Sequence, residues 1–262
     1  AIALAVSAIP EGLPVALTLT LAVSTRRMAK RGVIVRRLAA VEGLGSCTLI
    51  ASDKTGTLTC NELTVREIGL ADGRCYQVSG EGFTPEGAVH WQGRALAAPA
   101  GAGHGALVEL ARAVILCNEA QLEQRNGGWS WRGDPTDVAL LAFARKLGLQ
   151  PDAENGARPQ LAGLPFEPER RYAATLHAQG LLLVKGAPER LAMMCADPAA
   201  AADMLVAAEG MAGRGLRVLA VATGRASPRH GASLAEPAEL RLLGVVGMID
   251  PPRAGVSAAI RA

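Results

Sequence analysis

The hydrophobic positions of this chain form one long apolar segment at its start and several short apolar runs after it. Residues 1–23 are apolar except for Ser7, Glu11, Thr18 and Thr20. An apolar stretch of about 20 residues is long enough to cross a bilayer as a helix. The later runs end at polar or glycine positions, which is typical of buried strands. They lie at residues 47–52, 181–184, 218–221 and 242–248.

Two further segments have the spacing of amphipathic helices. Apolar residues recur at helical intervals over residues 107–124 and 135–149. Asp134 stands directly before Pro135, a favourable N-cap followed by a proline at the first helical position, so the second helix should begin there. Residues 64–95 instead carry strand-like runs separated by turns that contain glycine and proline.

The long apolar segment contains a break in its predicted helix. Pro10 and Pro14 bracket Glu11, and a proline removes a backbone donor and disturbs the preceding turn. At membrane depth the freed carbonyls need protein, water or an ion, and a carboxylate beside them indicates a functional site. Six Lys and Arg residues follow within residues 26–37 without one acid, and the positive-inside rule then places residues 26–262 in the cytoplasm. The alternative is a soluble core helix that follows a proline-rich turn.

The remaining charge and the cysteines restrict the class of protein. The net charge is +3, and without the six basic residues the acidic side chains outnumber the basic ones. A nucleic-acid-binding protein spreads positive charge over a face, so we expect no nucleic-acid partner. The five cysteines form no C-x-x-C pair, which indicates reduced thiols and argues against a zinc site. The chain begins inside the apolar segment without an initiator Met or signal peptide, so we expect a fragment of a longer protein.

The most distinctive local sequence follows the run at 47–52. Residues 53–59 are Asp-Lys-Thr-Gly-Thr-Leu-Thr. A buried parallel strand that ends at Asp53 would carry this carboxylate to the sheet edge where open α/β sheets place their active sites. The Thr-Gly-Thr amides and hydroxyls, with Lys54, suit a phosphoryl group, so Asp53 is a candidate nucleophile that forms an aspartyl phosphate. A plain strand-to-turn junction is the alternative.

This heptad resembles the phosphorylation signature of the P-type, or E1–E2, cation-transporting ATPases. Residues 9–14, Ile-Pro-Glu-Gly-Leu-Pro, resemble the broken fourth membrane helix of the type II pumps, especially the calcium pumps. Three further motifs resemble those of the family and stand in the same order, at residues 133–137, 185–189 and 250–253. The resemblance therefore extends from the fourth membrane helix through the nucleotide-binding domain.

The resemblance implies roles for the residues around Asp53. Asp53 would accept the phosphoryl group of ATP, and Mg²⁺ would be held by Asp53 and the Thr55 carbonyl. Lys54 would offset negative charge, while Thr57 would hold the transferring oxygens.

The resemblance also implies a site for the transported cation in the apolar segment. Ca²⁺ suits an all-oxygen site, and the protein would then be an integral protein of the cell membrane with the lipid bilayer as a partner. The ligands would be the Glu11 carboxylate and backbone carbonyls near Val6, Ser7 and Ile9.

The nucleotide site has candidates of its own. Phe166, between Pro165 and Pro168, either stacks on a base or belongs to the core. Lys185, at the end of an apolar strand, either reaches the nucleotide or points into solvent. Arg171 stands where the family has lysine, which keeps the charge and changes the geometry. By resemblance, Asp137 meets the adenine amino group, and the full nucleotide-binding set is Asp137, Phe166, Arg171, Lys185, Gly186, Arg217 and Asp250.

These patterns predict an α/β chain that includes an α+β nucleotide-binding domain, an antiparallel sheet with flanking helices. This domain would be inserted in an incomplete haloacid-dehalogenase-like phosphorylation domain and preceded by one transmembrane helix. The expected boundaries are 1–24 for the membrane helix, 25–45 for a basic stalk, 46–61 and 249–262 for the two parts of the phosphorylation domain, and 62–248 for the nucleotide-binding domain.

The function implied is ATP-driven cation transport through an aspartyl phosphate, with Ca²⁺ as the first choice and Mn²⁺, Na⁺, K⁺ and H⁺ left open. An actuator domain and further membrane helices of the parent protein would be its partners. One alternative is an isolated ATP-binding module without turnover. Another is a soluble haloacid-dehalogenase-like phosphatase, a class that carries Asp-x-Asp. Here Thr55 takes the place of the second acid and cannot activate water well, which favours a long-lived phosphoenzyme.

Overall fold

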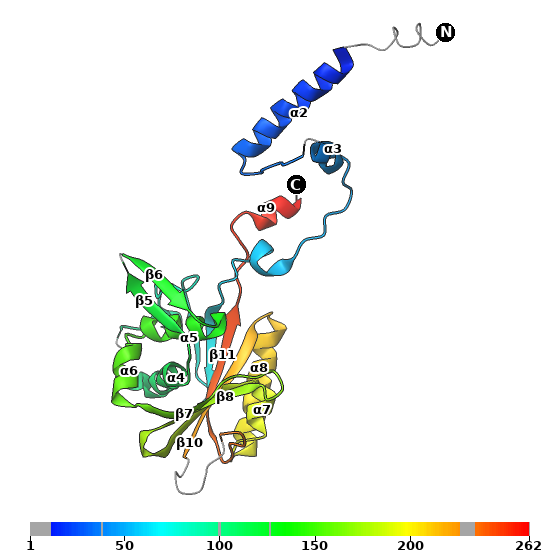
Figure 1. Ribbon diagram of the computed structural model, residues 1–262. Coiled ribbons are helices and arrows are strands. Elements are labelled where there is room, and N and C mark those ends of the chain that lie inside the picture. Colours follow the sequence, from blue (N-terminus) through cyan, green and yellow to red (C-terminus); the bar gives the residue numbers. More distant parts are fainter. Residues whose placement is uncertain (1–11, 38, 99–100, 126, 226–233, 262) are drawn as a thin grey trace. The chain divides into compact units, whose positions relative to one another are not determined.

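The computed structural model describes residues 12–37, 39–98, 101–125, 127–225 and 234–261 (Figure 1). The chain divides into two compact units, Ala1–Ser52 and Asp53–Ala262. The first unit contains helices, and the second contains a large sheet with helices on both of its faces.

The first unit contains helices α2 (Gly12–Lys30) and α3 (Ala39–Gly45). The segment predicted as a basic stalk, residues 25–45, therefore contains the end of α2 and all of α3, and Gly32 with a φ of +79° lies in the turn that ends α2. No helix in the described ranges is long and apolar enough to cross a membrane. Residues 1–11 of the predicted span lie outside the described residues.

The strand predicted over residues 47–52 is wrong for this structure. The segment has no regular secondary structure, and Leu49 and Ile50 are exposed. A buried parallel strand needs neighbours on both sides to pair its N–H and C=O groups. In the described parts of the chain no sheet includes this segment, so it has no strand with which to pair.

The second unit is built on a nine-stranded sheet in which every paired neighbour is antiparallel. The strand order is β4-β3-β2-β1-β11-β10-β9-β8-β7. This arrangement confirms the predicted antiparallel sheet with flanking helices. The strands are β1 (Thr64–Leu70), β2 (Cys75–Val78), β3 (Val89–Trp91), β4 (Arg94–Ala95), β7 (Gln160–Leu164), β8 (Tyr172–His177), β9 (Leu181–Gly186), β10 (Arg217–Arg225) and β11 (Arg241–Ile249).

Helices cover both faces of this sheet (Figure 1). One face packs against α4 (Gly105–Leu116) and α5 (Pro135–Lys146), with α6 (Pro151–Ala157) beside α4. The opposite face packs against α7 (Pro188–Ala192) and α8 (Pro198–Gly213). The remaining elements are the hairpin β5 (Gln121–Arg125) and β6 (Gly128–Arg132), short helical turns at Lys54–Leu58, Ala102–His104 and Ala178–Gly180, and α9 (Val256–Arg261).

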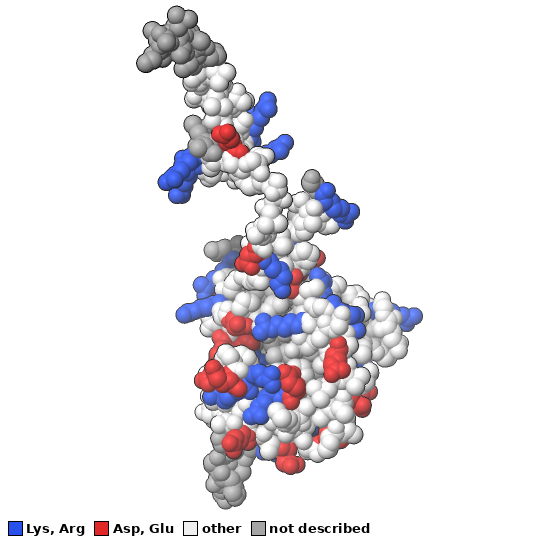
Figure 2. All heavy atoms as spheres, turned by 90° about the vertical axis from the view of Figure 1, so that its right-hand side faces the viewer, with Lys and Arg blue, Asp and Glu red and all other residues white. Residues whose placement is uncertain are grey.

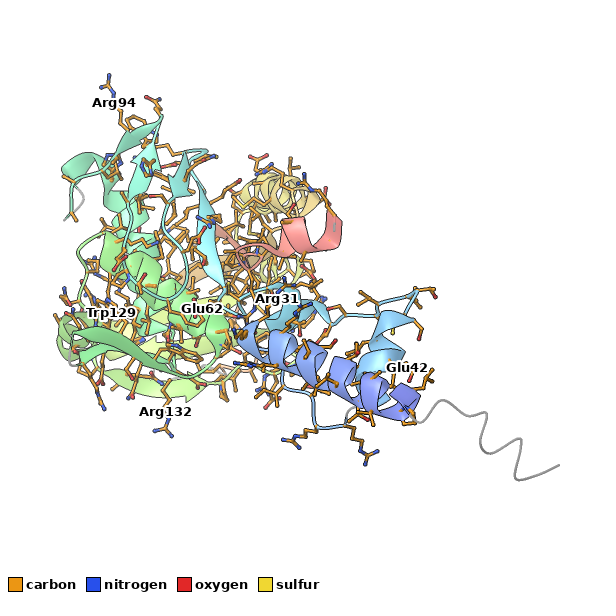
Figure 3. All side chains as sticks on the ribbon, turned by 90° about the horizontal axis from the view of Figure 1, so that it is seen from above. Arg31, Glu42, Glu62, Arg94, Trp129 and Arg132 are labelled. Atoms are coloured by element: carbon orange, nitrogen blue, oxygen red, sulfur yellow. The ribbon has the colours of Figure 1, made fainter. Side chains whose placement is uncertain are left out.

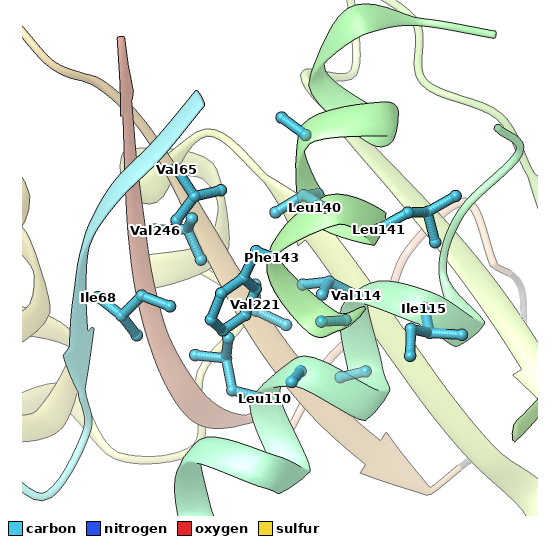
Figure 4. Packing of buried hydrophobic residues seen from close by; sticks show 14 of the residues in the cluster. Val65, Ile68, Leu110, Val114, Ile115, Leu140, Leu141, Phe143, Val221 and Val246 are labelled. Carbon is cyan, nitrogen blue, oxygen red and sulfur yellow. The ribbon is translucent and has the colours of Figure 1, made fainter. Parts of the chain in front are cut away.

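The larger core lies between the sheet and helices α4 and α5. Phe143 of α5 and Leu110 of α4 point toward Val246 of β11 and its neighbours (Figure 4). These side chains are fully or almost fully buried, and burial of each contributes roughly 1.5–3 kcal/mol relative to exposure. The core therefore fixes α5, whose first turn carries Asp137, against the sheet.

The helix predicted over residues 107–124 ends earlier than expected. Helix α4 stops at Leu116, with Cys117 as its C-cap, and residues 121–125 form β5, paired with β6. The segment Gln-Leu-Glu-Gln-Arg has good helix formers, so its sequence alone does not exclude a helix. The turn at Gly127, whose φ is +79°, brings β6 back along it and supplies the pairing that makes it a strand.

Surface charges of both signs are interspersed over the larger unit in the face that Figure 2 shows. Arg94 of β4 and Arg132 of β6 point outward on opposite sides of this unit in Figure 3. The surface ion pairs include Arg125 with Glu123 at 2.7 Å and Arg170 with Glu167 at 2.9 Å. Such exposed pairs contribute at most about 1 kcal/mol each, so the buried core stabilises this unit far more than they do.

Lys146, in the last turn of α5, provides a pH-dependent contribution to stability. It is 8% exposed, and its Nζ donates to the Ser79 carbonyl at 2.7 Å. Burial, assisted by the nearby Arg66 charge, lowers the pKa of Lys146 from 10.5 to about 8.

We predict that Lys146→Met removes a rise in stability with pH. Between about pH 8 and 10.5 the folded chain releases this proton while the unfolded chain keeps it, so the free energy of unfolding increases with pH by up to about 3 kcal/mol. Urea unfolding at several pH values measures this. Across this pH range the free energy of unfolding of the wild-type chain should rise relative to that of Lys146→Met. Lys30→Met, at an exposed position of α2, is the control. Parallel pH profiles for wild type and Lys146→Met would contradict the prediction.

Candidate functional site

A cavity of about 250 Å³ lies where the first turn of α5 meets strands β8, β9 and β10. Its walls combine apolar and polar side chains, and among them are the buried charged groups of Asp137 and Lys185. Such a mixture is typical of small-molecule sites. The lining residues used below are Asn118, Asp137, Phe166, Ala173, Lys185 and Leu219.

Asp137 and Lys185 form an ion pair in this cavity. The Lys185 Nζ bonds the Asp137 Oδ1, and the backbone N–H of Glu119 donates to Asp137 Oδ2 at 3.1 Å. The two side chains are 12% and 7% exposed, respectively. Burying a charge is unfavourable unless it is paired and hydrogen-bonded, so the pair explains how both charges are tolerated inside the unit.

Local sequence places Asp137 on this wall. The Asp134 side chain accepts from the Thr136 backbone N–H at 2.8 Å and caps α5, and Pro135 occupies the first turn. The predicted start of this helix is confirmed. Asp137 then lies in the first turn, where the positive end of the helix dipole favours a carboxylate.

Phe166 lies in the loop between β7 and β8 and also lines the cavity. It is 52% exposed, so the alternative that it belongs to the core is wrong. Ala173 and Leu219 supply apolar surface on the sheet side of the cavity. An exposed ring above an apolar wall can stack on a planar ligand.

A second cavity of about 480 Å³ adjoins the first and shares Asp134, Thr136 and Arg217 with it. Lys54 and Thr55 line this second cavity, and so does Asp250. In the described residues Arg217 makes no ion pair. The two cavities therefore form a path from Phe166 to the loop that begins at Lys54.

The segment after β11 holds the loop at residues 54–59 in place. Asp250 Oδ2 accepts from the Thr59 hydroxyl at 2.5 Å, and Asp250 Oδ1 accepts from the Glu62 backbone N–H at 3.2 Å. Arg253 donates to the carbonyls of Thr59 and Gly56 at 3.1 and 2.9 Å. Asp250 is thus engaged with protein groups while it lines the second cavity.

Several predicted site residues do not line either cavity. Asp53 is exposed and accepts from the Lys54 backbone N–H at 2.7 Å, and Thr57 is exposed in the same loop. Arg171 has a φ of +59° and pairs with Glu189 at 2.9 Å. The four residues predicted to bind the transported cation, Val6, Ser7, Ile9 and Glu11, lie outside the described residues.

Gly186, the residue after Lys185, allows strands β8 and β9 to pack closely. It pairs with Tyr172 across β8 and β9. A Cβ at this position would lie 2.4 Å from the Arg171 carbonyl oxygen and 2.7 Å from the Tyr172 Cα. Glycine therefore permits the close approach of β8 and β9 at the end of the strand that carries Lys185.

Sequence reasoning missed the cavity residues that precede β5 and those on β8. Cys117 is buried beside the ion pair, and burial raises the pKa of its thiol, although the Lys185 charge opposes this. Thr175 of β8 accepts from or donates to the buried His177 at 3.0 Å. The Asn118 side-chain nitrogen donates to the Asp137 carbonyl, and the Glu119 backbone N–H donates to the Asp137 carboxylate. No sequence signal could have found them, because residues 117–119 lie inside the helix predicted over residues 107–124 and their contacts join segments distant in sequence.

Comparison with known proteins identifies the family of this chain. Residues 106–255 match the model of the family "P-type ATPase, cytoplasmic domain N". The chain is 44% identical over 278 residues to "Cation-transporting ATPase pma1" of Synechocystis, covering 100% of this chain and 30% of that protein. It is 42% identical over 277 residues to "Probable cation-transporting ATPase F" of Mycobacterium tuberculosis, covering 100% of this chain and 30% of that protein.

A more distant similarity links the chain to animal calcium pumps. It is 37% identical over 281 residues to human "Calcium-transporting ATPase type 2C member 1", covering 99% of this chain and 28% of that protein. The chain spans about 30% of the length of the Synechocystis and Mycobacterium tuberculosis relatives. The chain belongs to the P-type ATPase family.

We predict that Gly186→Ala destabilises the second unit. The added methyl must displace backbone of β8, and such overpacking costs about 1–3 kcal/mol. Urea unfolding should show a lower free energy of unfolding for Gly186→Ala. The decrease should also appear in nucleotide-free buffer. Gly213→Ala in α8 is the matched control, since nothing lies within 4 Å of its added Cβ, and it should be neutral or slightly stabilising. Equal stability of the two variants would contradict the close approach.

Proposed function

We propose that this chain is the ATP-binding part of a cation-transporting P-type ATPase that forms an aspartyl phosphate at Asp53. The observation that carries the proposal is the pair of adjoining cavities. They connect the Asp137–Lys185 ion pair and Phe166 with Lys54 and Thr55, next to Asp53 in the chain. The family match and the relatives named as cation-transporting ATPases support it.

The first cavity suits the adenine base. The Asp137 carboxylate accepts hydrogen bonds only, so it favours the exocyclic amino group of adenine over the carbonyl of guanine. Phe166 stacks on the base above the apolar surface of Ala173 and Leu219. Lys185 stays near the nucleotide as the partner of Asp137.

The second cavity suits the phosphates. Arg217 lies at the junction of both cavities and Lys54 at the far end. An Arg fork and a Lys point charge are the side chains that proteins commonly use for phosphate. Arg171 would contribute only after leaving Glu189, and Asp250 acts here by fixing the loop at residues 54–59.

The chemical step uses the loop at residues 53–57. A carboxylate oxygen of Asp53 attacks the γ-phosphorus of ATP, the bond from this phosphorus to the β,γ-bridging oxygen breaks, and ADP leaves with the electron pair. Lys54 offsets the negative charge, and the Thr57 hydroxyl donates to a transferring oxygen. The Asp53 carboxylate and Thr55 carbonyl are hard oxygen donors that fit Mg²⁺, which when bound neutralises the charge of the phosphates.

The phosphorylated Asp53 would then drive transport. Thr55 stands where a hydrolase of the haloacid-dehalogenase type has its second acid, so the phosphoenzyme persists long enough for a conformational change. The insertion of the sheet unit in a phosphorylation domain of that type, and a membrane helix before it, are parts of this proposal. Glu11 and the carbonyls near Val6, Ser7 and Ile9 would bind the cation, with residues 26–262 cytoplasmic.

Ca²⁺ is the proposed cargo, because relatives of the chain include proteins named calcium-transporting ATPases and because oxygen ligands suit it. An actuator domain, further membrane helices and the lipid bilayer are the proposed partners in the complete protein.

We predict that Phe166→Ala weakens ATP binding without a loss of stability. Stacking of a base on an aromatic ring contributes roughly 1–3 kcal/mol, so the dissociation constant should rise about tenfold. The ring is half-exposed, so the midpoint of thermal unfolding should not change. Isothermal titration with ATP measures the affinity, and Leu161→Ala, at an exposed position of β7, is the control. Unchanged ATP affinity in Phe166→Ala would place the base elsewhere.

We predict that Asp53→Asn abolishes phosphoenzyme formation in the complete pump. The amide is a far weaker nucleophile than the carboxylate. Radiolabelled ATP should give an acid-stable, ion-dependent phosphoprotein with the wild type and none with Asp53→Asn. Asp203→Asn, at an exposed position of α8, should retain the label. Rapid loss of the label without dependence on a transported ion would favour the phosphatase alternative.

A further inference from the structure

Asn118 lies in the segment between α4 and β5 and lines the cavity that contains Asp137. Its side-chain nitrogen donates to the Val114 carbonyl at 3.1 Å and to the Asp137 carbonyl at 3.0 Å. Its side-chain oxygen accepts from the Ala120 backbone N–H at 2.8 Å. One side chain therefore joins the end of α4, the first turn of α5 and the segment that leads into β5.

These contacts specify both the residue type and the orientation of the amide. The nitrogen faces two carbonyl oxygens, which only accept hydrogen bonds, so a flipped amide would place oxygen against oxygen. An aspartate at this position has no donor when ionised, and a serine has a single donor. The asparagine amide nitrogen carries two N–H donors and its oxygen is an acceptor. These groups match the two carbonyls and the one backbone N–H that surround the side chain.

The same segment fixes the Asp137 carboxylate. The backbone N–H of Glu119, the next residue, donates to Asp137 Oδ2 at 3.1 Å, while Lys185 bonds Oδ1 from the opposite side. Asn118 thus holds the main chain of Asp137, and its neighbour holds the side chain. Both contacts depend on the position of the segment between α4 and β5, which the Asn118 side chain links to α4 and α5 through hydrogen bonds.

We propose that Asn118 is a positioning residue for nucleotide binding, which acts through Asp137 by fixing its carboxylate toward the base. This inference rests on the proposed ATP site. A binding group that is already held in its bound orientation loses less freedom when the ligand arrives, which strengthens binding. Loss of Asn118 releases Asp137 and the Glu119 amide together.

The test is isothermal titration of ATP into the 262-residue chain and its variants. Asn118→Ala should bind ATP roughly five- to tenfold more weakly, the effect expected for loss of one or two hydrogen bonds to a binding group. Asn118→Asp, which keeps the size but places an oxygen against two carbonyls, should bind at least as weakly. In an Asp137→Asn background, Asn118→Ala should cause little further loss. Additive losses in the double variant would overturn the proposal, because Asn118 would then act independently of Asp137.

A control separates positioning from a general loss of stability. Ile68→Val removes one buried methyl group from β1, and Ile68 lines neither cavity. The midpoint of thermal unfolding should fall in both Ile68→Val and Asn118→Ala. Only Asn118→Ala should bind ATP more weakly. A similar loss of affinity in both variants would overturn the proposal.

The outcomes also separate this inference from the proposed function. A wild-type chain that does not bind ATP would overturn both. A wild-type chain that binds ATP, with Asp137→Asn weakened and Asn118→Ala unchanged, would overturn the role of Asn118 alone.

Discussion

The pairing of β1 with β11 is the constraint on which the larger unit depends. These strands are far apart in sequence, yet Thr64 pairs with Ile249 and Leu70 with Gly244. The pairing joins the strands β4 to β1 to the strands β11 to β7 in one sheet, and it brings Thr64 and Ile249 side by side (Figure 1). Asp250, one residue after β11, can then bind Thr59 and Glu62, and the second cavity forms between this junction and α5. The proposed phosphate site therefore depends on this pairing, because the end of β11 and Asp250 line the second cavity.

The ion pair of Asp137 and Lys185 places two buried charges in a cavity whose walls are partly apolar. The desolvation of a buried pair offsets much of its Coulomb attraction, so such a pair is weak evidence for stability. It does create a carboxylate with two fixed partners at a position that a ligand can reach. The helix that carries Asp137, α5, packs on the sheet through Phe143 and its neighbours. A polar site held by a packed scaffold is what small-ligand recognition requires.

Prediction succeeded where the signal was local. The start of α5 follows from the Asp134 cap and Pro135, and β9, β10 and β11 follow from apolar runs bounded by polar residues. It was wrong for residues 121–125, whose helix formers pair as a strand, and for residues 47–52, which no described strand pairs with. Strand formation depends on a partner, and the partner is not part of the local sequence.

The sequence by itself determined the family, through motifs whose residue types and order are preserved along the chain. It also determined that Asp137 lies in the first turn of a helix and that Lys185 lies near the end of a strand, because caps and apolar runs act over a few residues. Only the tertiary structure decided that Lys185 bonds Asp137, that Arg171 pairs with Glu189 outside the cavities, and that Asn118 holds Asp137. Each of these contacts joins segments that the sheet brings together, so its geometry depends on long-range packing that no local pattern encodes.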